Sequence, residues 1–369
     1  MAIPYRAEHV GSLLRPTALI EAREAWEAGR MQASALKEIE DHAILDALEM
    51  QRQTGVSVLS DGEFRRSNWG GGFLDALEGL GEDPRGRAAG RAWKGAHAEV
   101  ASATLPKQKI VTGKLRAREP FASGEASFLK AHAGAPFKIT IPSPTMFHHL
   151  FTPGLSEPAY ASSEDVLEDL VQICTAEIDR LHKLEVPYIQ LDSLRYINVI
   201  DAADKGALDP TEAARTLDAL IAADNRVLAS ARRDGVTRGV HLCRGNHRSS
   251  WTVKGSYDSV AEKLFAEVDA DRFLLEYDDE RSGGFEPLRF MPKGKVVVLG
   301  LVTTKSPQLE TIDALRRRVD EAAKFVPFDN LAIGTQCGFA STHLGNLLTE
   351  DEERKKLELV AEAARRIWG

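Results

Sequence analysis

Residues 238–243, 272–277 and 295–301 read RGVHLC, RFLLEY and KVVVLGL, three short apolar runs set between longer polar segments. Continuous apolar runs are typical of parallel strands that are buried on both faces. Five more candidate strands lie outward from these three: RAEHVGS near the start, VSVLSD (56–61), FKITIP (137–142), VPYIQLD (186–192) and NLAIGT (330–335). The sequence therefore contains eight candidate strands.

Segments with helical periodicity separate most of these runs. Examples are SEDVLEDLVQICTAEIDRLHKL and TIDALRRRVDEAAKF, which begin with Ser and Thr residues suited to capping a helix. Eight strands alternating with helices predict an α/β fold, a (β/α)8 TIM barrel. A doubly wound open sheet is the alternative, but that fold usually carries a GxGxxG turn after its first strand, and the sequence has none.

Residues 62–135 are too long for a single strand–helix connection. The stretch NWGGGFLDALEGLGEDPRGRAAGRAW, followed by KQKIVTGKLRA, predicts an inserted loop and β-hairpin after the second strand. Loops at the rim of a barrel commonly shape access to its active face. We therefore expect residues 1–369 to form one barrel, with residues 62–135 as a rim insertion.

Composition narrows the functional classes. The chain has 369 residues, of which 43% are hydrophobic and 28% charged, and its formal net charge is -8. An acidic protein of this kind is not expected to bind nucleic acid, and no apolar run approaches the roughly 20 residues of a membrane helix. Three cysteines and no signal-like start predict a cytoplasmic protein without a disulfide framework.

Polar residues recur where the predicted strands end. Because the carboxyl ends of barrel strands share one face, which is where active sites lie, these residues should meet in one pocket. In strand order they are Ser12, Asp61 with Glu63, Ser143, Asp192, His241 with Cys243, Glu276, Thr303 to Lys305, and Cys337.

This set includes ligands suited to zinc, which accepts imidazole, thiolate and carboxylate together. His241 and Cys243 are two residues apart, so on a strand their side chains point to the same face. Glu276 ends the next strand, and Cys337 follows the strand two further on. An isolated H-x-C pair is more often core packing, but the convergence of four candidate ligands favours a zinc site.

Other reactive side chains have competing interpretations. Cys174 lies on the apolar stripe of its predicted helix, which predicts a buried small hydrophobe. His148 and His149 could line the pocket or lie in a loop, whereas His247 is expected behind the ligand pair or at the surface. Arg65 and Arg66 could bind an acidic substrate group, although balancing nearby acids is slightly favoured.

Seven motifs in order carry a family resemblance: RAEHVGSLLRP, SDGEFRRSNW, TIPSPTMF, IQLDSLRY, HLCRGNHRSSW, LEYDDERSGGFEPL and TQCGFAST. The chain resembles the C-terminal catalytic barrel of cobalamin-independent methionine synthase, and more closely the short single-barrel relatives of that enzyme. The resemblance implies one zinc ion held by His241, Cys243, Glu276 and Cys337.

The same resemblance implies contacts with homocysteine. Ser12 matches the segment that binds the substrate carboxylate, and Glu63 and Asp192 match the acids that hold its ammonium group. The expected activity is zinc-dependent transfer of a methyl group to the homocysteine thiol. The methyl donor is expected to be a folate or a corrinoid, the latter free or on a carrier protein.

Two departures from the family pattern concern the donor. The family's catalytic His after the seventh strand is absent, and LGLVTTKSPQ places Lys305 near that position. PTMFHHLF replaces the tryptophan-bearing segment that helps to hold folate. The alternatives are therefore a corrinoid-dependent methionine synthase, an epoxyalkane–coenzyme M transferase-like enzyme, and a non-catalytic zinc-binding barrel. A homo-oligomer is left open.

Overall fold

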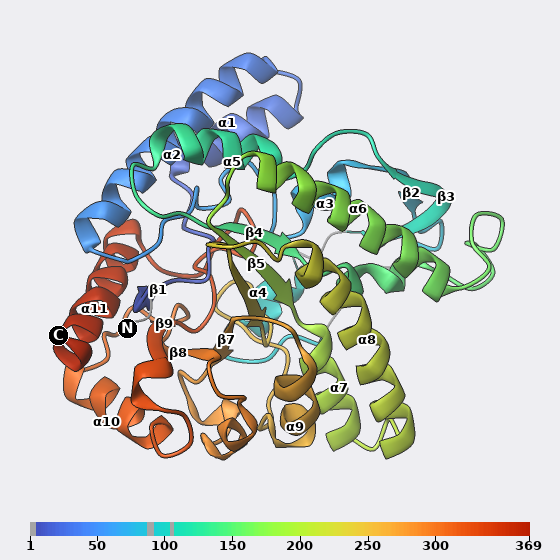
Figure 1. Cartoon of the computed structure of the whole chain (residues 1–369). Helices are drawn as coiled ribbons and strands as arrows, with labels where there is room; N and C mark the ends of the chain where they lie inside the picture. The colour runs from blue at the N-terminus through green and yellow to red at the C-terminus, as the bar shows by residue number, and fades with distance from the viewer. Residues whose placement is uncertain (1–4, 87–91, 104–106) are drawn as a thin grey trace.

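The computed structural model of the chain describes residues 5–86, 92–103 and 107–369. Seven strands form one curled parallel sheet in the order β1-β9-β8-β7-β6-β5-β4 (Figure 1). Their buried, β-branched and leucine-rich sequences agree with parallel strands covered on both faces. The strands are β1 Ala7–Glu8, β4 Ile139–Pro142, β5 Tyr188–Ser193, β6 Thr237–Leu242, β7 Arg272–Glu276, β8 Val296–Val302 and β9 Leu331–Thr335.

The run at 56–61 occupies the gap between β1 and β4. The Ser57 amide donates to the Ala7 carbonyl at 2.7 Å, and on the other side the Lys138 amide donates to the Leu59 carbonyl at 2.9 Å. This run makes a single parallel bridge, from Leu59 to Phe137, because side-chain hydrogen bonds take over at Ser60, where the chain turns. The TIM-barrel prediction is confirmed, with its second strand reduced to this bridge.

Helices cover the outside of the sheet (Figure 1). Their caps are local in sequence: Ser162 accepts from the Asp165 amide, and Thr349 forms a capping box with Glu352. Cys174 is fully buried on the inner face of α6, as predicted. The helices are α1 Thr17–Glu27, α2 Ala33–Thr54, α6 Ser163–Lys183, α7 Arg195–Asp204, α8 Pro210–Ser230, α9 Asp258–Glu267, α10 Ile312–Ala322 and α11 Glu350–Trp368, with short 3-10 helices η1 Pro144–Leu150, η2 Glu280–Ser282, η3 Glu286–Phe290 and η4 Phe328–Asn330.

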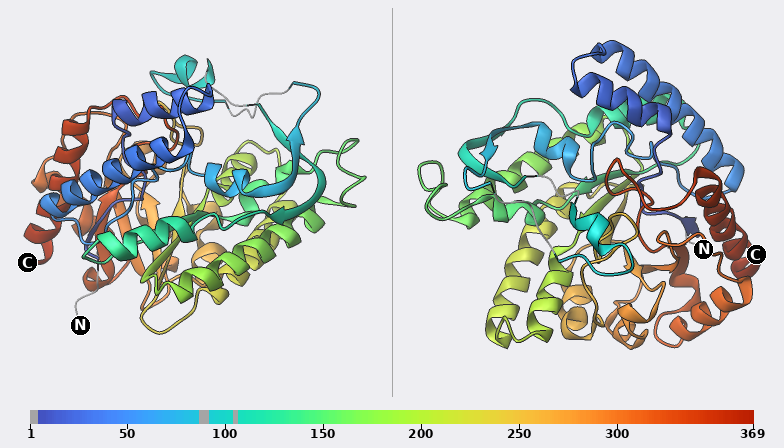
Figure 2. Two further views of the ribbon diagram at one scale, coloured as in Figure 1. Left: turned by 90° about the horizontal axis from the view of Figure 1, so that it is seen from above. Right: turned by 180° about the vertical axis from the view of Figure 1, so that it is seen from behind.

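The insertion after the second run contains more regular structure than its glycine-rich sequence suggests. It holds the predicted hairpin, an antiparallel pair of β2 and β3, together with three short helices. Figure 2 shows the hairpin beside the barrel and α4 in front of the carboxyl ends of the strands. The one-unit division with bounds 62–135 stays a prediction. The elements are α3 Gly71–Asp75, β2 Leu77–Glu82, α4 Ala98–Ala103, β3 Lys109–Ala117 and α5 Ser123–His132.

A cluster of charged side chains fills the barrel near the beginnings of its strands. Glu8 accepts from Arg272 at 2.7 Å through one carboxylate oxygen, and from Lys138 at 3.2 Å and Tyr188 at 3.1 Å through the other. Lys138 also donates to Gln190 at 2.8 Å. Charges this deeply buried are tolerated because each carboxylate oxygen has a donor within the protein.

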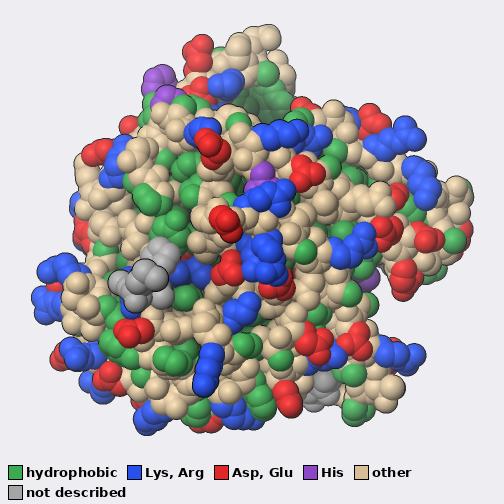
Figure 3. Space-filling model, viewed as in Figure 1, with side chains coloured by type: hydrophobic (Ala, Val, Ile, Leu, Met, Phe, Trp, Pro, Cys, Tyr) green, Lys and Arg blue, Asp and Glu red, His purple; other side chains and the backbone are tan. Residues whose placement is uncertain are grey.

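The surface carries both signs of charge. On the face shown in Figure 3, Lys and Arg side chains are interspersed with Asp and Glu rather than gathered into one basic patch. Within the described ranges, no helix combines the length and the apolar character that a membrane crossing requires.

Candidate metal centre and substrate pocket

A cavity of about 530 Å³ opens at the carboxyl ends of the barrel strands. Strand ends form its floor, and the rim insertion and η1 contribute aromatic side chains to its walls. Six of the predicted site residues line it: Ser12, Glu63, Asp192, His241, Cys243 and Cys337. Side chains from opposite ends of the sequence therefore meet in one pocket.

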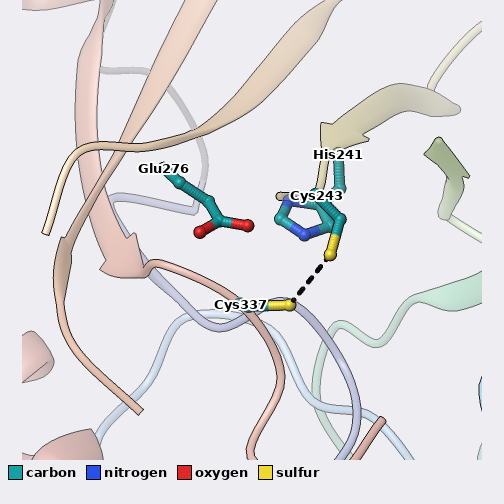
Figure 4. A group of neighbouring side chains, drawn as sticks. All are labelled: His241, Cys243, Glu276 and Cys337. Atoms are coloured by element: carbon teal, nitrogen blue, oxygen red, sulfur yellow. Dashed lines mark hydrogen bonds between the residues drawn. The ribbon is translucent and has the colours of Figure 1, made fainter. Parts of the chain in front are cut away.

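Four side chains that could bind a metal gather beside this cavity, and three of them, His241, Cys243 and Cys337, line it. His241 lies in β6 and Cys243 just beyond it, Glu276 ends the neighbouring β7, and Cys337 follows β9. One ligand atom from each lies within 4.8 Å of the others, and all four residues are buried. Figure 4 shows the four side chains pointing toward a common space.

Hydrogen bonds fix the His241 ring and the two thiols. His241 Nδ1 lies 3.3 Å from the Leu274 carbonyl, whereas its buried Nε2 makes no hydrogen bond of ordinary geometry with the described residues. A backbone partner on one ring nitrogen and an open second nitrogen is the usual state of a metal-binding histidine. The sulfurs of Cys243 and Cys337 lie 3.5 Å apart, and the Gly245 amide donates to Cys243 Sγ at 3.3 Å.

The electrostatic environment of this cluster favours a cation. Burial by itself lowers the pKa of His241, but Cys337, Asp192 and Glu276 around the ring raise it to about 9. The pKa of Cys337 is raised well above its usual value by contact with Cys243 and by burial. A thiol in this position needs a nearby positive charge to ionise at neutral pH.

Glu276 is held by donors of its own. One carboxylate oxygen accepts from the Arg244 amide at 2.6 Å, and the other from the Arg281 guanidinium at 3.2 Å. These bonds aim the carboxylate without filling all its lone pairs. One nitrogen, two sulfurs and one oxygen form a donor set that could hold zinc, and the adjoining cavity is typical of catalytic sites rather than closed structural ones.

Two buried acids lie in the same cavity. Glu63 Oε1 accepts from the Thr140 hydroxyl at 2.8 Å, while its buried Oε2 has no partner among the described residues. Asp192 accepts from Gln190 Nε2 at 2.8 Å. Burial raises the pKa of Glu63 to about 7, and the charge of Asp192 adds to this effect against that of Arg66. Burial also raises the pKa of Asp192.

Local backbone features place Glu63 and Ser12. Glu63 has a φ of 60°, which is costly for a residue with a side chain and persists where the surroundings enforce it. Ser12 lies against Gly338, since a Cβ added at Gly338 would come within 1.9 Å of the Ser12 hydroxyl. Glycine at 338 therefore lets the first and last strand ends approach each other.

Comparison with known protein families decides the classification. The family model described as "Cobalamin-independent synthase, Catalytic domain" matches residues 151–366. The chain belongs to this family.

Similar proteins cover almost the whole length of this family member. Bacillus subtilis YxjH, described as an uncharacterized protein, is 39% identical over 374 residues, which span 99% of this chain and 95% of YxjH. A Listeria monocytogenes structure with the provisional description of vitamin-B12 independent methionine synthase has a TM-score of 0.75 at 29% identity, covering 100% of this chain and 99% of that one.

A third similar protein shows the fold only. The B12-independent methionine synthase from Shewanella sp. W3-18-1, solved in complex with selenomethionine, has a TM-score of 0.74 at 21% identity and covers 99% of this chain and 98% of that chain. Together with the Listeria protein, it supports the TIM-barrel-like fold of this chain.

Lys305, which the sequence predicts to lie near the position of the family's catalytic His, is directed to a neighbouring side chain. Its Nζ donates to Asn246 Oδ1 at 2.7 Å and lies 3.4 Å from the Gly245 carbonyl. Lys305 is not among the described residues that line the cavity, whereas Asn246 is. A catalytic role for Lys305 in this family member stays a prediction.

The three histidines left open by the sequence separate in space. His149 lines the cavity, with Nδ1 2.8 Å from the Met146 carbonyl. His148 Nε2 lies 3.0 Å from an Arg195 nitrogen, and His148 is not among the described lining residues. His247 is buried behind the wall, against the ring of Trp93.

Arg65 and Arg66 balance acids, as the sequence slightly favoured. Arg65 pairs with Glu40 at 3.3 Å and with Asp41, both on α2. Arg66 forms a two-pronged pair with Glu125 of α5. Neither arginine is among the described residues that line the cavity.

Several lining residues were not predicted from the sequence. The aromatic wall comes from the insertion and from η1, and polar groups from α7 and the loop after β6 face the same space. Only the NWGGG stretch, noted as a rim loop, pointed toward any of them. These residues include Trp69, Trp93, Phe147, Asn198 and Asn246.

Proposed function

We propose that the chain is a zinc-dependent methyltransferase that moves a methyl group to the thiol of homocysteine and forms methionine. In this respect it would resemble 5-methyltetrahydropteroyltriglutamate–homocysteine S-methyltransferase. The observation that carries the proposal is the convergence of four donor atoms within 4.8 Å, beside a cavity that three of the four residues line. Family membership supports the same chemistry.

The zinc ion would be held by His241, Cys243, Glu276 and Cys337. When bound, zinc lowers the pKa of a coordinated thiol, so that a thiolate nucleophile is available at neutral pH. The Leu274 carbonyl orients the His241 ring, and Arg281 and the Arg244 amide orient Glu276. These contacts prepare the site before any ligand enters it.

The amino-acid part of homocysteine would lie beside the metal. Glu63 and Asp192 would hold its ammonium group, because two buried carboxylates in one cavity favour a cation between them. Ser12 would contact its carboxylate. The Shewanella structure, which has a similar fold, was solved in complex with selenomethionine, an amino acid close to methionine in size. This complex supports the proposal that the present fold binds an amino acid of that size.

The aromatic wall would receive the methyl donor and keep water from the reacting sulfur. Trp69 and Phe147 are stacked with centroids 6.0 Å apart, and both face the cavity. A folate is the first candidate donor because it is the donor of the full-length family enzyme. Its amine leaving group needs a proton, and Lys305 is bonded to Asn246 rather than facing the cavity.

A methylated corrinoid is the second candidate donor. The observation that favours it is the same placement of Lys305, because a corrinoid leaving group needs no proton. An epoxyalkane–coenzyme M transferase is disfavoured, since Arg65 and Arg66 are paired with acids and a sulfonate would meet Glu63 and Asp192. A non-catalytic zinc barrel would leave the open Glu63 oxygen unexplained.

The proposed function also implies a cellular location and a set of partners for the protein. Reduced thiol ligands suit the cytoplasm. Homocysteine and the methyl donor are the expected partners, and a corrinoid would arrive free or on a carrier protein. A homo-oligomer remains open.

The test is a methyl-transfer assay with zinc-loaded protein and homocysteine. Methyl-folate, methylcobalamin and simple methylated compounds are compared as donors, with protein stripped of metal by a chelator as the control. We expect methionine to form with one donor class and to disappear after stripping. Equal activity with and without zinc would contradict the proposal.

A further inference from the structure

A buried network joins helix α5 of the rim insertion to Glu63 in the cavity. Arg66 donates through Nε to Glu125 Oε1 at 2.7 Å, and through Nη2 to the other carboxylate oxygen. Arg66 Nη1 donates to the Thr140 hydroxyl at 3.1 Å, and that hydroxyl donates to Glu63 at 2.8 Å. The chain of contacts therefore runs from Glu125 through Arg66 and Thr140 to Glu63.

Arg66 forms its ion pair with Glu125 rather than with Glu63. Its two strongest contacts form a parallel pair with Glu125, the geometry in which a guanidinium binds a carboxylate best. The nearest Arg66 nitrogen is 3.8 Å from Glu63 Oε1, beyond hydrogen-bond distance. Glu63 lines the cavity, and its buried Oε2 is left without a partner among the described residues.

The cations around Glu63 and Asp192 are already engaged by other groups. The buried acids of this region are Asp61, Glu63, Glu125 and Asp192, and the cations that act on them include Arg15, Arg66, Lys138 and His241. Lys138 is paired with Glu8 at 3.2 Å. The Arg15 guanidinium donates hydrogen bonds to the backbone carbonyls of Ala340, Glu63 and Arg66. Burial raises the pKa of Glu63 and of Glu125 to about 7, against the opposing effect of the Arg66 charge. A cation bound beside Glu63 would favour the charged form of this carboxyl.

We propose that Glu125 is a specificity-determining positioning residue: by holding Arg66, it keeps Glu63 un-neutralised, so that the cavity selects thiols that carry an ammonium group. This inference rests on the proposed function, because it assigns the ammonium site of that function a support in the rim insertion. Without the Glu125 charge, Arg66 pairs with Glu63, and an incoming ammonium group must compete with it.

The experiment compares two ligands on the zinc-loaded full chain at pH 8. Homocysteine carries the ammonium group, and 4-mercaptobutanoate has the same thiol and carboxylate without it. In Glu125→Gln, we expect the affinity for homocysteine to fall about tenfold, the size of one charge-assisted hydrogen bond, while that for 4-mercaptobutanoate stays unchanged. Equal changes for both ligands, or none, overturn the inference.

A matched control removes another buried acid beside the same helix. Glu177 accepts from the amides of Ala122 at 2.9 Å and Ser123 at 2.7 Å, so Glu177→Gln loosens the start of α5 without touching Arg66. We expect the ratio of the two affinities to stay at the wild-type value. The same loss of selectivity in this control would assign the effect to helix position and overturn the inference.

Thr140→Val tests the network from its other end and serves if Glu125→Gln does not fold. It removes the hydroxyl between Arg66 and Glu63, and we expect the preference for homocysteine to fall in the same direction. An unchanged preference in this variant counts against the inference. A wild-type protein without any preference for homocysteine would instead overturn the proposed function.

Discussion

The barrel contains two groups of buried polar side chains that differ in how far the protein satisfies them. Near the strand beginnings, Glu8 is fully bonded by Lys138, Arg272 and Tyr188. Near the strand ends, His241 Nε2 and Glu63 Oε2 are equally buried and lack partners among the described residues. Burying either group costs desolvation free energy. Only in the first group do hydrogen bonds within the protein offset this cost.

The difference separates a structural cluster from a candidate binding site. A closed network holds strands together and has no capacity left for a ligand. An open network has polar atoms without a protein partner, and these atoms are available to a bound ligand or metal ion. Changes at the strand beginnings should therefore lower stability, and changes at the strand ends should lower binding.

The largest expected effect is that of Cys337→Ser. Removing a ligand atom should lower zinc affinity by more than the roughly 10- to 100-fold typical of outer hydrogen-bond partners, and methyl transfer should be lost with it. Metal content after dialysis against a chelator measures this. Cys174→Ser is the matched control and should keep the metal. Full zinc occupancy and activity in Cys337→Ser would remove the basis of the metal site.

Glu8→Gln should lower stability and leave zinc binding intact, in contrast to Cys337→Ser. It leaves Lys138 and Arg272 buried without their carboxylate, so the free energy of unfolding should fall by about 3–5 kcal/mol. Denaturant unfolding measures the loss. The folded variant should still bind one zinc ion per chain, and a loss of zinc with unchanged stability would reverse the comparison.

Glu63→Gln should weaken binding without weakening the fold. The amide cannot pair with an ammonium group as a carboxylate does, so homocysteine affinity should drop roughly 10- to 100-fold, while stability should not fall. Titration calorimetry with homocysteine and 4-mercaptobutanoate measures the two affinities. A similar loss for both ligands would show that Glu63 does not bind the ammonium group.

The smallest expected effect is a pH dependence set by Glu63. Its pKa of about 7 in the folded protein means that its charge is lost as pH falls through that value, so the preference for homocysteine should shrink by up to about tenfold between pH 8 and pH 6. Asp192, Arg66 and Arg15 are the other charges that act on this carboxyl. A preference that is constant over this range would exclude Glu63 as the controlling group.

The raised pKa of Glu63 also affects the stability of the ligand-free protein. As pH rises, the contribution of Glu63 to stability falls, whereas the preference for homocysteine increases. Because the folded pKa of Glu63 is raised, its contribution to ligand-free stability is fully present below the unfolded pKa. That contribution is lost as pH rises through about 7. Thermal unfolding of ligand-free wild type and Glu63→Gln should therefore diverge between pH 5 and pH 8, with the variant less sensitive to pH.

The sequence by itself determined the barrel and the ligand cluster. Short continuous apolar runs that alternate with helical segments are typical of buried parallel strands, and the carboxyl ends of such strands share a face in a barrel. The strand-end positions of His241, Cys243, Glu276 and Cys337 therefore predict from the sequence that these four side chains lie together. Their convergence follows from position along strands, which is a local property of the sequence.

Only the tertiary structure decided which polar groups are satisfied. Nothing local in the sequence pairs Arg66 with Glu125, turns Lys305 toward Asn246, or reduces residues 56–61 to a single bridge. Such partners are distant in sequence, and their pairing depends on how the strand-end loops and the insertion pack together. The difference between a closed charge cluster and an open site is therefore a property of the folded chain.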